Sequence, residues 1–565
     1  MHTAGISERI RGIARRTMAA CLLLTLLSSS LGLSVAAQVY TPVFTRDEVI
    51  ADARQLMAII EENHPDPYLH GGGKIALHLQ FQELLASIPA DGMTKAAFAG
   101  LLRPFVASLG DSHTRTSNAY ATNRYTPGGV PLEFGVVEQS LFVLGVLDHE
   151  NARLIGSVLV AVQGFPLAEL LARQLQLAAS ENRYHGLEMM RTKTLVYEPY
   201  LHELIPEWTD HTSICVELRL TSGETESVSF HLPRQARYIS RNTRISLPSV
   251  QDVSGFRLEF IDPLETGDDM AYLRIDHTSG YREHAEMAVS LGAHSATEEQ
   301  LQQIPSATEA LRDLVIEMRE KNTDTLVVDL RGGGGGNSLM SDILIYFLYG
   351  KDRLHDIMTE AGAAGGGVLQ RYSTLFLEQL GALTLEEINE GRDVLLRLGD
   401  YDFSTYFEGD TDRFAELAED PTADHYFLEP QYPNATTFYG EFTSGDYAGH
   451  YTPNNVIVLV SPNTYSAGFL MMQQLDLAGA TLVGTPSSQS PNFFDLATGW
   501  RLDNTGIEGT ISHGWFLLSP KDPGRAGIWS IDLPLTYGYL ATTGFDPNAE
   551  MLLALEWLGT EKGTE

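Results

Sequence analysis

Cysteine is nearly absent from this sequence, which has only Cys21 and Cys215 among its 565 residues. Two cysteines cannot form a zinc ribbon or a disulfide framework, so neither is expected. The histidines show no His-Glu-x-x-His pattern and no other paired ligand spacing. We therefore expect no metal ion and no other cofactor.

Basic residues are also scarce, because 38 lysines and arginines stand against 73 acidic residues and give a formal charge of -35. A surface this acidic repels phosphate backbones, which excludes nucleic acid as a partner. Hydrophobic residues make up 43% and charged residues 20%. That composition is typical of a folded globular protein, and the length predicts two to four domains.

A long hydrophobic run is lacking at the N-terminus as well. Residues 1–16 carry four arginines and one acid, the apolar run 18–33 follows, and Ser34-Val35-Ala36-Ala37 closes the segment. The run is shorter than the roughly 20 residues that span a membrane, so an integral anchor is not expected. The pattern predicts a signal peptide over 1–37 and an exported protein, periplasmic or extracellular.

Hydrophobic periodicity divides the remaining chain into three parts. We expect a helical domain over 40–124, a β-rich module over 125–265 and an α/β domain over 266–565. An acidic stretch, 351–430, holds 18 acids and 6 bases and is predicted to be a helical insertion.

Individual elements are expected from the same patterns. Helices are predicted after the capping residue Thr45 and at 75–88, 95–109, 167–179, 297–321, 338–348, 465–477 and 549–558. Strands are predicted at 134–137, 141–147, 158–162, 214–220, 227–232, 270–275, 325–330, 455–460 and 481–484. Strands that alternate with helices after residue 270 indicate α/β layering.

Five glycines, Gly332–Gly336, follow Asp329-Leu330-Arg331 at the end of a predicted strand. Bare backbone at a strand-to-helix turn can direct several N–H groups at a phosphate or an oxyanion. A Walker-type phosphate loop would need a lysine, but Asn337-Ser338 follows instead. A flexible turn without function remains the alternative.

A second strand end carries Ser466, within Thr464-Tyr465-Ser466-Ala467-Gly468. At this turn its Oγ would be exposed beside the N–H of Ala467, which suits a nucleophile, but an N-cap serine fits the same position. A nucleophilic serine needs a base, and His113, in a polar turn after Gly110, is one candidate. Spacing alone decides neither question.

Together these segments resemble the tail-specific, or C-terminal-processing, serine peptidase family on the ClpP/crotonase-like α/β fold. The glycine turn is similar to the family's Asp-Leu-Arg-x-Asn-x-Gly-Gly motif, and Ser466 matches its nucleophile. Val162-Gln163-Gly164-Phe165-Pro166 is similar to a turn of the family's PDZ-like module. Pro491 stands where the Ser-Lys branch has its lysine, whereas Ser112-His113 matches the Ser-His branch, which resembles the tricorn core protease.

The resemblance implies a serine peptidase acting on peptides or proteins through an acyl-enzyme. His113 would be the base, preceded by Ser112, and the N–H groups of Ala467 and of Gly334 or Gly335 would hold the oxyanion. The acid partner of the histidine is expected late in the chain, with Asp522 and Asp532 as candidates. A non-catalytic binding protein on the same fold and an esterase remain alternatives, and the oligomeric state is left open.

Overall fold

The structure is a computed structural model. It describes residues 42–116, 128–147, 149–232, 239–240, 251–253, 256–261, 270–290, 295–363, 366–379, 384–389, 392–405, 450–519 and 527–561. Residues 1–37, where a signal peptide is predicted, lie outside these ranges. No helix in the ranges described is long and apolar enough to cross a membrane.

A seven-stranded sheet in the order β11-β12-β13-β14-β17-β18-β23 is the centre of the C-terminal half. Its members are β11 (Gln251–Val253), β12 (Phe256–Ile261), β13 (Met270–Ile275), β14 (Thr325–Asp329), β17 (Asn455–Val460), β18 (Thr481–Gly484) and β23 (Leu533–Pro534). The strands from β13 to β23 pair in parallel, and β11 and β12 extend the sheet antiparallel. Parallel neighbours end at one edge, so the segments after β14 and β17 meet there.

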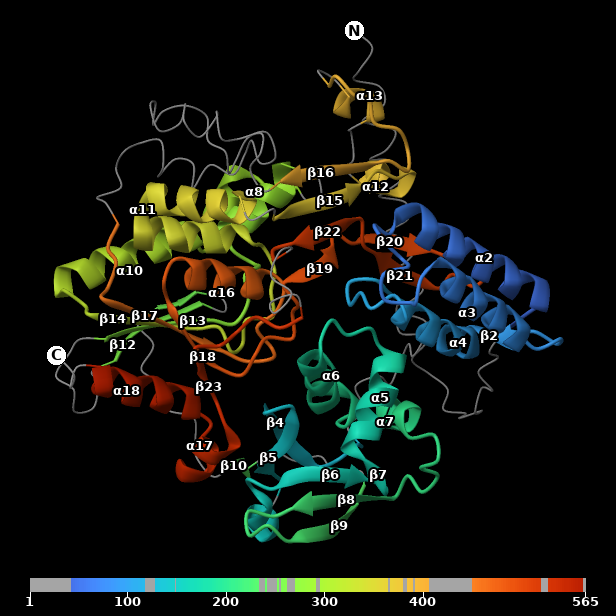
Figure 1. The fold of residues 1–565 in the computed structure, drawn as a ribbon, viewed down its shortest axis with the longest axis horizontal. Helices are drawn as coiled ribbons and strands as arrows, with labels where there is room; N and C mark the ends of the chain where they lie inside the picture. The colour runs from blue at the N-terminus through green and yellow to red at the C-terminus, as the bar shows by residue number, and fades with distance from the viewer. Residues whose placement is uncertain are drawn as a thin grey trace, which may run out of the picture. The chain divides into compact units, whose positions relative to one another are not determined.

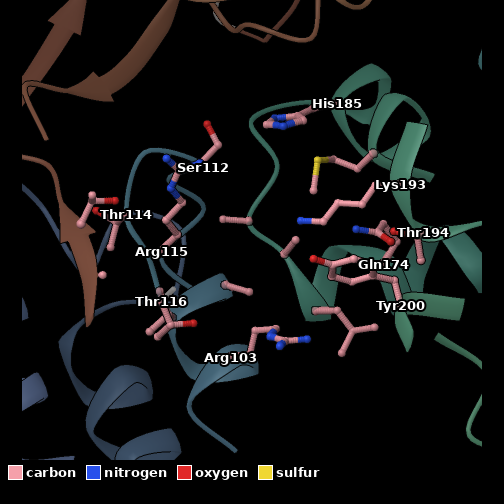
Figure 2. A pocket seen from close by; sticks show the side chains of 18 of the residues that line it. Arg103, Ser112, Thr114, Arg115, Thr116, Gln174, His185, Lys193, Thr194 and Tyr200 are labelled. Atoms are coloured by element: carbon pink, nitrogen blue, oxygen red, sulfur yellow. The ribbon is translucent and has the colours of Figure 1, made fainter. Parts of the chain in front are cut away.

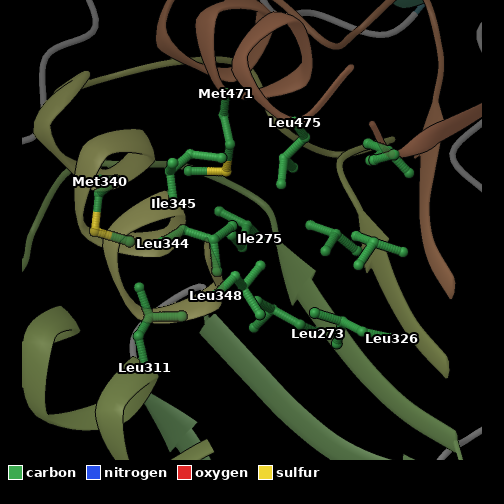
Figure 3. Packing of buried hydrophobic residues seen from close by; sticks show 14 of the residues in the cluster. Leu273, Ile275, Leu311, Leu326, Met340, Leu344, Ile345, Leu348, Met471 and Leu475 are labelled. Carbon is green, nitrogen blue, oxygen red and sulfur yellow. The ribbon is translucent and has the colours of Figure 1, made fainter. Parts of the chain in front are cut away.

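Side chains of this sheet alternate between two apolar cores. On one face, Leu326 packs with Leu311, Leu344 and Met471 from the covering helices (Figure 3). These helices are α10 (Ala307–Lys321), α11 (Leu339–Ala363) and α16 (Ala467–Leu477). On the other face, Val327 belongs to a second core with residues of α18 (Ala549–Glu561). Figure 1 shows α18 on the side of the sheet opposite α10, α11 and α16. Burial on both faces explains why these strands are continuously apolar.

The single helix predicted over 297–321 is wrong, because the structure divides it. α9 (Glu298–Gln302) ends before Pro305, and α10 begins after Ser306, whose side chain accepts a hydrogen bond from the Glu309 N–H. Proline supplies no N–H to an α-helix, and serine is a favoured cap. α11 likewise changes direction at Gly350, which has φ +85°.

A second seven-stranded sheet is built mainly from the predicted β-rich segment. It contains β4 (Leu132–Val137), β5 (Ser140–Val146), β6 (Val158–Val162), β7 (Phe165–Pro166), β8 (Ser213–Arg219), β9 (Thr225–His231) and β10 (Ile239–Ser240). Leu170, Leu187 and Leu201 bury their side chains in its core. They come from α5 (Leu167–Leu177), α6 (Arg183–Met189) and α7 (Glu198–Leu204). A short π-helix, η2 (Met190–Thr194), joins α6 to the segment before α7.

Three N-terminal helices form a smaller core, as predicted. They are α2 (Arg46–Asn63), α3 (Lys74–Ser87) and α4 (Lys95–Ala107), and Thr45 with Glu48 makes the expected capping box. Trp500 and Ile511 of the hairpin β20 (Thr498–Arg501) and β21 (Glu508–Ile511) pack into the same core. β3 (Arg115–Thr116) pairs with β21. The turn before β3, which contains His113, is thereby attached to the C-terminal half.

The acidic stretch 351–430 is not purely helical, which corrects the sequence-based prediction. Its described part contains β15 (Gly367–Arg371) and β16 (Tyr401–Thr405) besides α12 (Thr374–Gln379) and α13 (Leu385–Ile388). β15 pairs with β22 (Gly514–Leu517), which also pairs with β19 (Asn492–Asp495). Hydrophobic periodicity did not predict β15 and β16, because most of the β15 side chains are only partly buried and β22, the partner of β15, is distant in sequence.

Candidate active site

Asp329 and Arg331 fix the end of β14 from which the glycine turn starts. Arg331 contacts Asp329 at 2.7 Å and Glu550 of α18 at 2.9 Å. The Tyr272 hydroxyl donates to Asp329 at 2.6 Å. Burial would raise the pKa of Asp329, but the charge and hydrogen bonds of Arg331, with the bond from Tyr272, outweigh it and lower the pKa. These two motif residues therefore anchor the turn to α18.

Gly335 passes directly beside Ser466. Its φ is +101°, and a Cβ added there would lie 2.7 Å from the Cβ of Ser466, so a side chain would be both strained and blocked. Gly334 has no such neighbour, and its N–H already donates to the carbonyls of Gly332 at 2.8 Å and Asp276 at 3.4 Å. Of the two predicted glycine donors, Gly334 is thus engaged within the turn.

Ser466 occupies the residue before α16 with φ 53° and ψ -123°, and its side chain makes no capping hydrogen bond. The capping alternative is therefore wrong, since a capping serine bonds a first-turn N–H. A positive φ is uncommon for a residue with a side chain and is typical of functional turns. Ala467 follows as the first helical residue, where backbone N–H groups lack intrahelical acceptors.

His113 lies against Tyr465, the residue before Ser466. The two rings stack with centroids 5.6 Å apart and an interplanar angle of 23°. The histidine side chain is 17% exposed, with Nδ1 3.8 Å from Glu181 and Nε2 3.8 Å from Asp495. Among the described residues no hydrogen bond joins His113 to Ser466, although the fold brings both segments to one place.

A buried pair, His64 and Asp111, holds the turn that carries His113. His64 Nε2 and Asp111 Oδ2 are 3.3 Å apart, and both side chains are fully buried. The other Asp111 oxygen accepts the backbone N–H of His113 at 2.8 Å. Burial acts to raise the pKa of Asp111, but His64 and the charge of His113 lower it overall. The ionised Asp111 carboxylate therefore holds the turn in place through its hydrogen bond from the His113 N–H.

Glu181 was not predicted, yet it connects most parts of the site. Its carboxylate accepts hydrogen bonds from the Ser112 hydroxyl at 2.6 Å, the Tyr465 hydroxyl at 2.8 Å and the Ser490 N–H at 3.0 Å. Burial raises its pKa to about 7, against the opposing charge of His113. It lies just before α6 and matches no motif, so only the folded chain reveals it.

Gln489 extends this network to Ser466. Its Oε1 accepts the Ser466 N–H at 3.2 Å, and its Nε2 donates to Glu181. The Glu181 carboxylate therefore contacts Ser112, which precedes His113, and Tyr465, which precedes Ser466. It also accepts a hydrogen bond from Gln489, which in turn accepts the Ser466 N–H. Such a network restricts the rotamers of its members and orients them together.

Residues 269–512 match a family model described as Peptidase family S41. The matched range contains the glycine turn, Ser466 and Gln489 described above. Residues 269–512 belong to peptidase family S41. This bears out the family expected from the motifs, and the chain is a serine-type peptidase, a hydrolase.

Solved structures of mature CPAF have a fold similar to that of this chain. One superimposes with a TM-score of 0.53 at 13% identity and covers 90% of this chain and 96% of that chain. Mature CPAF complexed with lactacystin gives a TM-score of 0.50 at 14% identity, covering 90% and 98%. No curated protein matches the sequence. The similarity confirms a mixed α/β peptidase fold.

Two acids were expected late in the chain. Asp522 lies outside the described residues. Asp532 accepts the Leu482 N–H at 2.8 Å and so anchors β18. Glu181 and Asp495, from elsewhere in the chain, face His113 instead. Within the described ranges no three His, Cys, Asp or Glu side chains are grouped to hold a metal ion.

Proposed function

We propose that this chain cleaves peptide bonds through an acyl-enzyme formed on Ser466, with His113 as the base. The observation that carries the proposal is the strained, uncapped Ser466 at the start of α16, with the ring of His113 stacked on the preceding residue. A serine free of capping bonds keeps its Oγ available for attack on a carbonyl. The family assignment makes that carbonyl a peptide carbonyl.

In the proposed reaction His113 takes the proton from the Ser466 hydroxyl as the oxygen attacks. The imidazolium then gives that proton to the leaving amine, and water releases the acyl group in a second, equivalent step. His113 and Ser466 are not hydrogen-bonded in the free chain, and catalytic hydrogen bonds often tighten only when substrate is bound. We infer that substrate brings the two groups together.

Glu181 is the acid that we assign to His113, in place of the late residues expected from the family. Its Oε1 lies 3.8 Å from Nδ1, and a buried negative charge at this distance stabilises an imidazolium. Asp495 is the other carboxylate near the ring, at 3.8 Å from Nε2. Glu181 is favoured because it is deeply buried and also bonds Ser112 and Tyr465.

The oxyanion would be held by the N–H groups of Ala467 and Gly335. Gly335 fits because its backbone is packed against Ser466 and, among the described residues, its N–H has no acceptor. Gly334 is less suited, since its N–H is already bonded to Gly332. Two backbone donors near the nucleophile are the usual means of stabilising a tetrahedral intermediate.

We further infer that the parallel sheet from β13 to β18 is a ClpP/crotonase-like core and that the sheet from β4 to β9 is PDZ-like. The tight β6–β7 turn supports the second inference, because Gln163 and Gly164 both have positive φ and α5 follows directly. Residues 1–37 are proposed to direct export to the periplasm or beyond. N-terminal sequencing of the secreted chain, starting near residue 38, tests this.

A peptide-hydrolysis assay on the secreted chain tests the proposed reaction. Ser466→Ala and His113→Ala should each lower kcat by a thousandfold or more. Ser488→Ala is the matched control, because that buried hydroxyl has no hydrogen-bond partner among the described residues and lies outside the proposed machinery. Activity that survives Ser466→Ala at the parent level contradicts the proposal. Hydrolysis of small esters but of no peptide would support the esterase alternative.

A further inference from the structure

A cavity of about 650 Å³ lies beside the proposed active site. Figure 2 shows its two walls, one from α4 and the turn leading into β3, the other from α5, α6 and η2. Ser112 and Tyr465 line it, and they directly precede His113 and Ser466. A cavity of this size accommodates a ligand as large as a short peptide segment.

Two polar groups in the lining have no hydrogen-bond partner among the residues that the structure describes. Gln174 is only 2% exposed, and its side-chain oxygen is buried without a hydrogen bond in the described part of the chain. Figure 2 shows this carboxamide directed from α5 into the cavity. The Nδ1 atom of His185, which also lines the cavity, is unpartnered in the same way. A buried polar group without a hydrogen bond is unfavourable, so a ligand that bonds these two groups is favoured.

The charged residues of the lining give a small net positive charge in an otherwise acidic protein. Arg103 lines the cavity and is paired with Glu203, and Glu508 is paired with Arg501. Arg115 and Lys193 also line it, and no carboxylate within the described ranges lies within ion-pair distance of Arg115. Figure 2 shows the Lys193 amine pointing into the cavity. The net positive lining favours a carboxylate on the ligand.

His185 contributes a neutral group to this lining. Burial, reinforced by the charge of His113, lowers its pKa to about 4. Its imidazole is therefore uncharged at neutral pH and can donate or accept a hydrogen bond. The ring also lies 5.2 Å from that of Tyr465. A ligand in the cavity would thus touch side chains that border the proposed nucleophile.

We propose that the cavity is a specificity subsite that binds a peptide segment bearing an acidic side chain. Lys193 and Arg115 would attract the carboxylate, while the Gln174 amide and His185 would bond the segment's backbone. This proposal rests on the peptidase function, because it assigns the segment to the substrate. It predicts that acidic residues at a fixed distance from the cleaved bond improve binding.

Binding is measured separately from catalysis by using the full secreted chain with Ser466→Ala. Fluorescent peptides with an amidated C-terminus are compared by anisotropy, one with glutamate and one with glutamine at the varied position. We expect the glutamate peptide to bind at least fivefold tighter. Lys193→Met should remove most of this difference, whereas Lys74→Met, an exposed lysine away from the cavity, should preserve it. Equal binding of the two peptides would overturn the subsite proposal. It would leave the proposed peptidase function standing, because that function is tested separately by the hydrolysis assay.

Gln174→Leu separates a binding role from a structural one. If Gln174 only fills space, removing its buried, unbonded side-chain oxygen should leave peptide binding unchanged and raise the melting temperature. The proposal instead predicts severalfold weaker binding of both peptides by a folded variant. A preference that appears only with a free C-terminal carboxylate, and not with the amidated peptides, would also contradict an acidic side chain as the ligand.

Discussion

The Glu181 carboxylate lies 3.8 Å from Nδ1 of His113. His113 lies in the turn before β3 and Glu181 just before α6, and no sequence motif links the two residues. This contact places a buried negative charge next to the proposed base. It also explains why Ser112 precedes the histidine, since the Ser112 hydroxyl donates to the same carboxylate.

Glu181→Gln should lower kcat by about a hundredfold or more while KM changes little, because the amide cannot stabilise an imidazolium. The parent should gain activity as pH rises through about 7, where the raised pKa of Glu181 lets it ionise. The variant should lack that gain. Glu188→Gln, which removes a carboxylate bonded to Arg191, is the control for a neighbouring charge. A pH profile identical in parent and Glu181→Gln would refute the assignment.

Gly335→Ala should abolish activity in a chain that still folds. The added methyl group would lie 2.7 Å from the Cβ of Ser466 and must displace either the glycine turn or the nucleophile. Gly334→Ala is the matched control, since nothing lies within 4 Å of its added Cβ and its N–H remains. Peptide hydrolysis and circular dichroism are compared for both. Equal activity in the two variants would show that the close approach has no role.

Asp342→Asn should stabilise the protein, and more so at pH 8 than at pH 5. Burial raises the pKa of Asp342 to about 7, with a hydrogen bond from Gln474 opposing the shift. The folded state therefore keeps a proton that the unfolded state releases above about pH 4. Stability from this group is complete below that pH and is lost as pH rises to about 7, by an amount on the order of a few kcal/mol.

Thermal melts across pH 5–8 measure this effect directly. The difference in melting temperature between Asp342→Asn and the parent should widen toward pH 8. Asp313→Asn, at an exposed position, should follow the parent at every pH. A constant difference across the range would mean that Asp342 is ionised throughout.

Asp111→Ala should lower both stability and activity, because it removes the acceptor of the His113 N–H and leaves His64 buried without its partner. Loss of such a buried pair typically costs about 3–5 kcal/mol. His78→Ala, on the exposed side of α3, is the control. Melting temperature and kcat measured together check the prediction, and a stable, fully active Asp111→Ala chain would contradict it.

Much of the fold could be predicted because local patterns were strong. The apolar strands β14 and β17, the caps of α2 and the helices after each strand follow from periodicity and from residues such as Thr45. The break at Pro305 was missed because the apolar stripe continues across it. β15 was missed because it pairs with β22, far away in sequence, and β16 was missed because it in turn pairs with β15.

Site residues could be predicted only where the backbone geometry requires a recognisable local sequence pattern. Ser466 and the glycine turn are visible because strand ends and bare backbone are encoded locally. Glu181 is not, since its role comes from contacts with Ser112, Tyr465 and Ser490, three separate segments. A single carboxylate among 73 acids gives no signal until the chain is folded.

Covalent labelling by a fluorophosphonate shows directly whether Ser466 is a nucleophile. The parent chain is treated with the probe, and its intact mass and labelled peptide are determined by mass spectrometry. We expect one adduct, on Ser466, that is absent in Ser466→Ala and strongly reduced in His113→Ala but retained in Ser488→Ala. A folded parent that takes no label, or that is labelled elsewhere, would contradict the account.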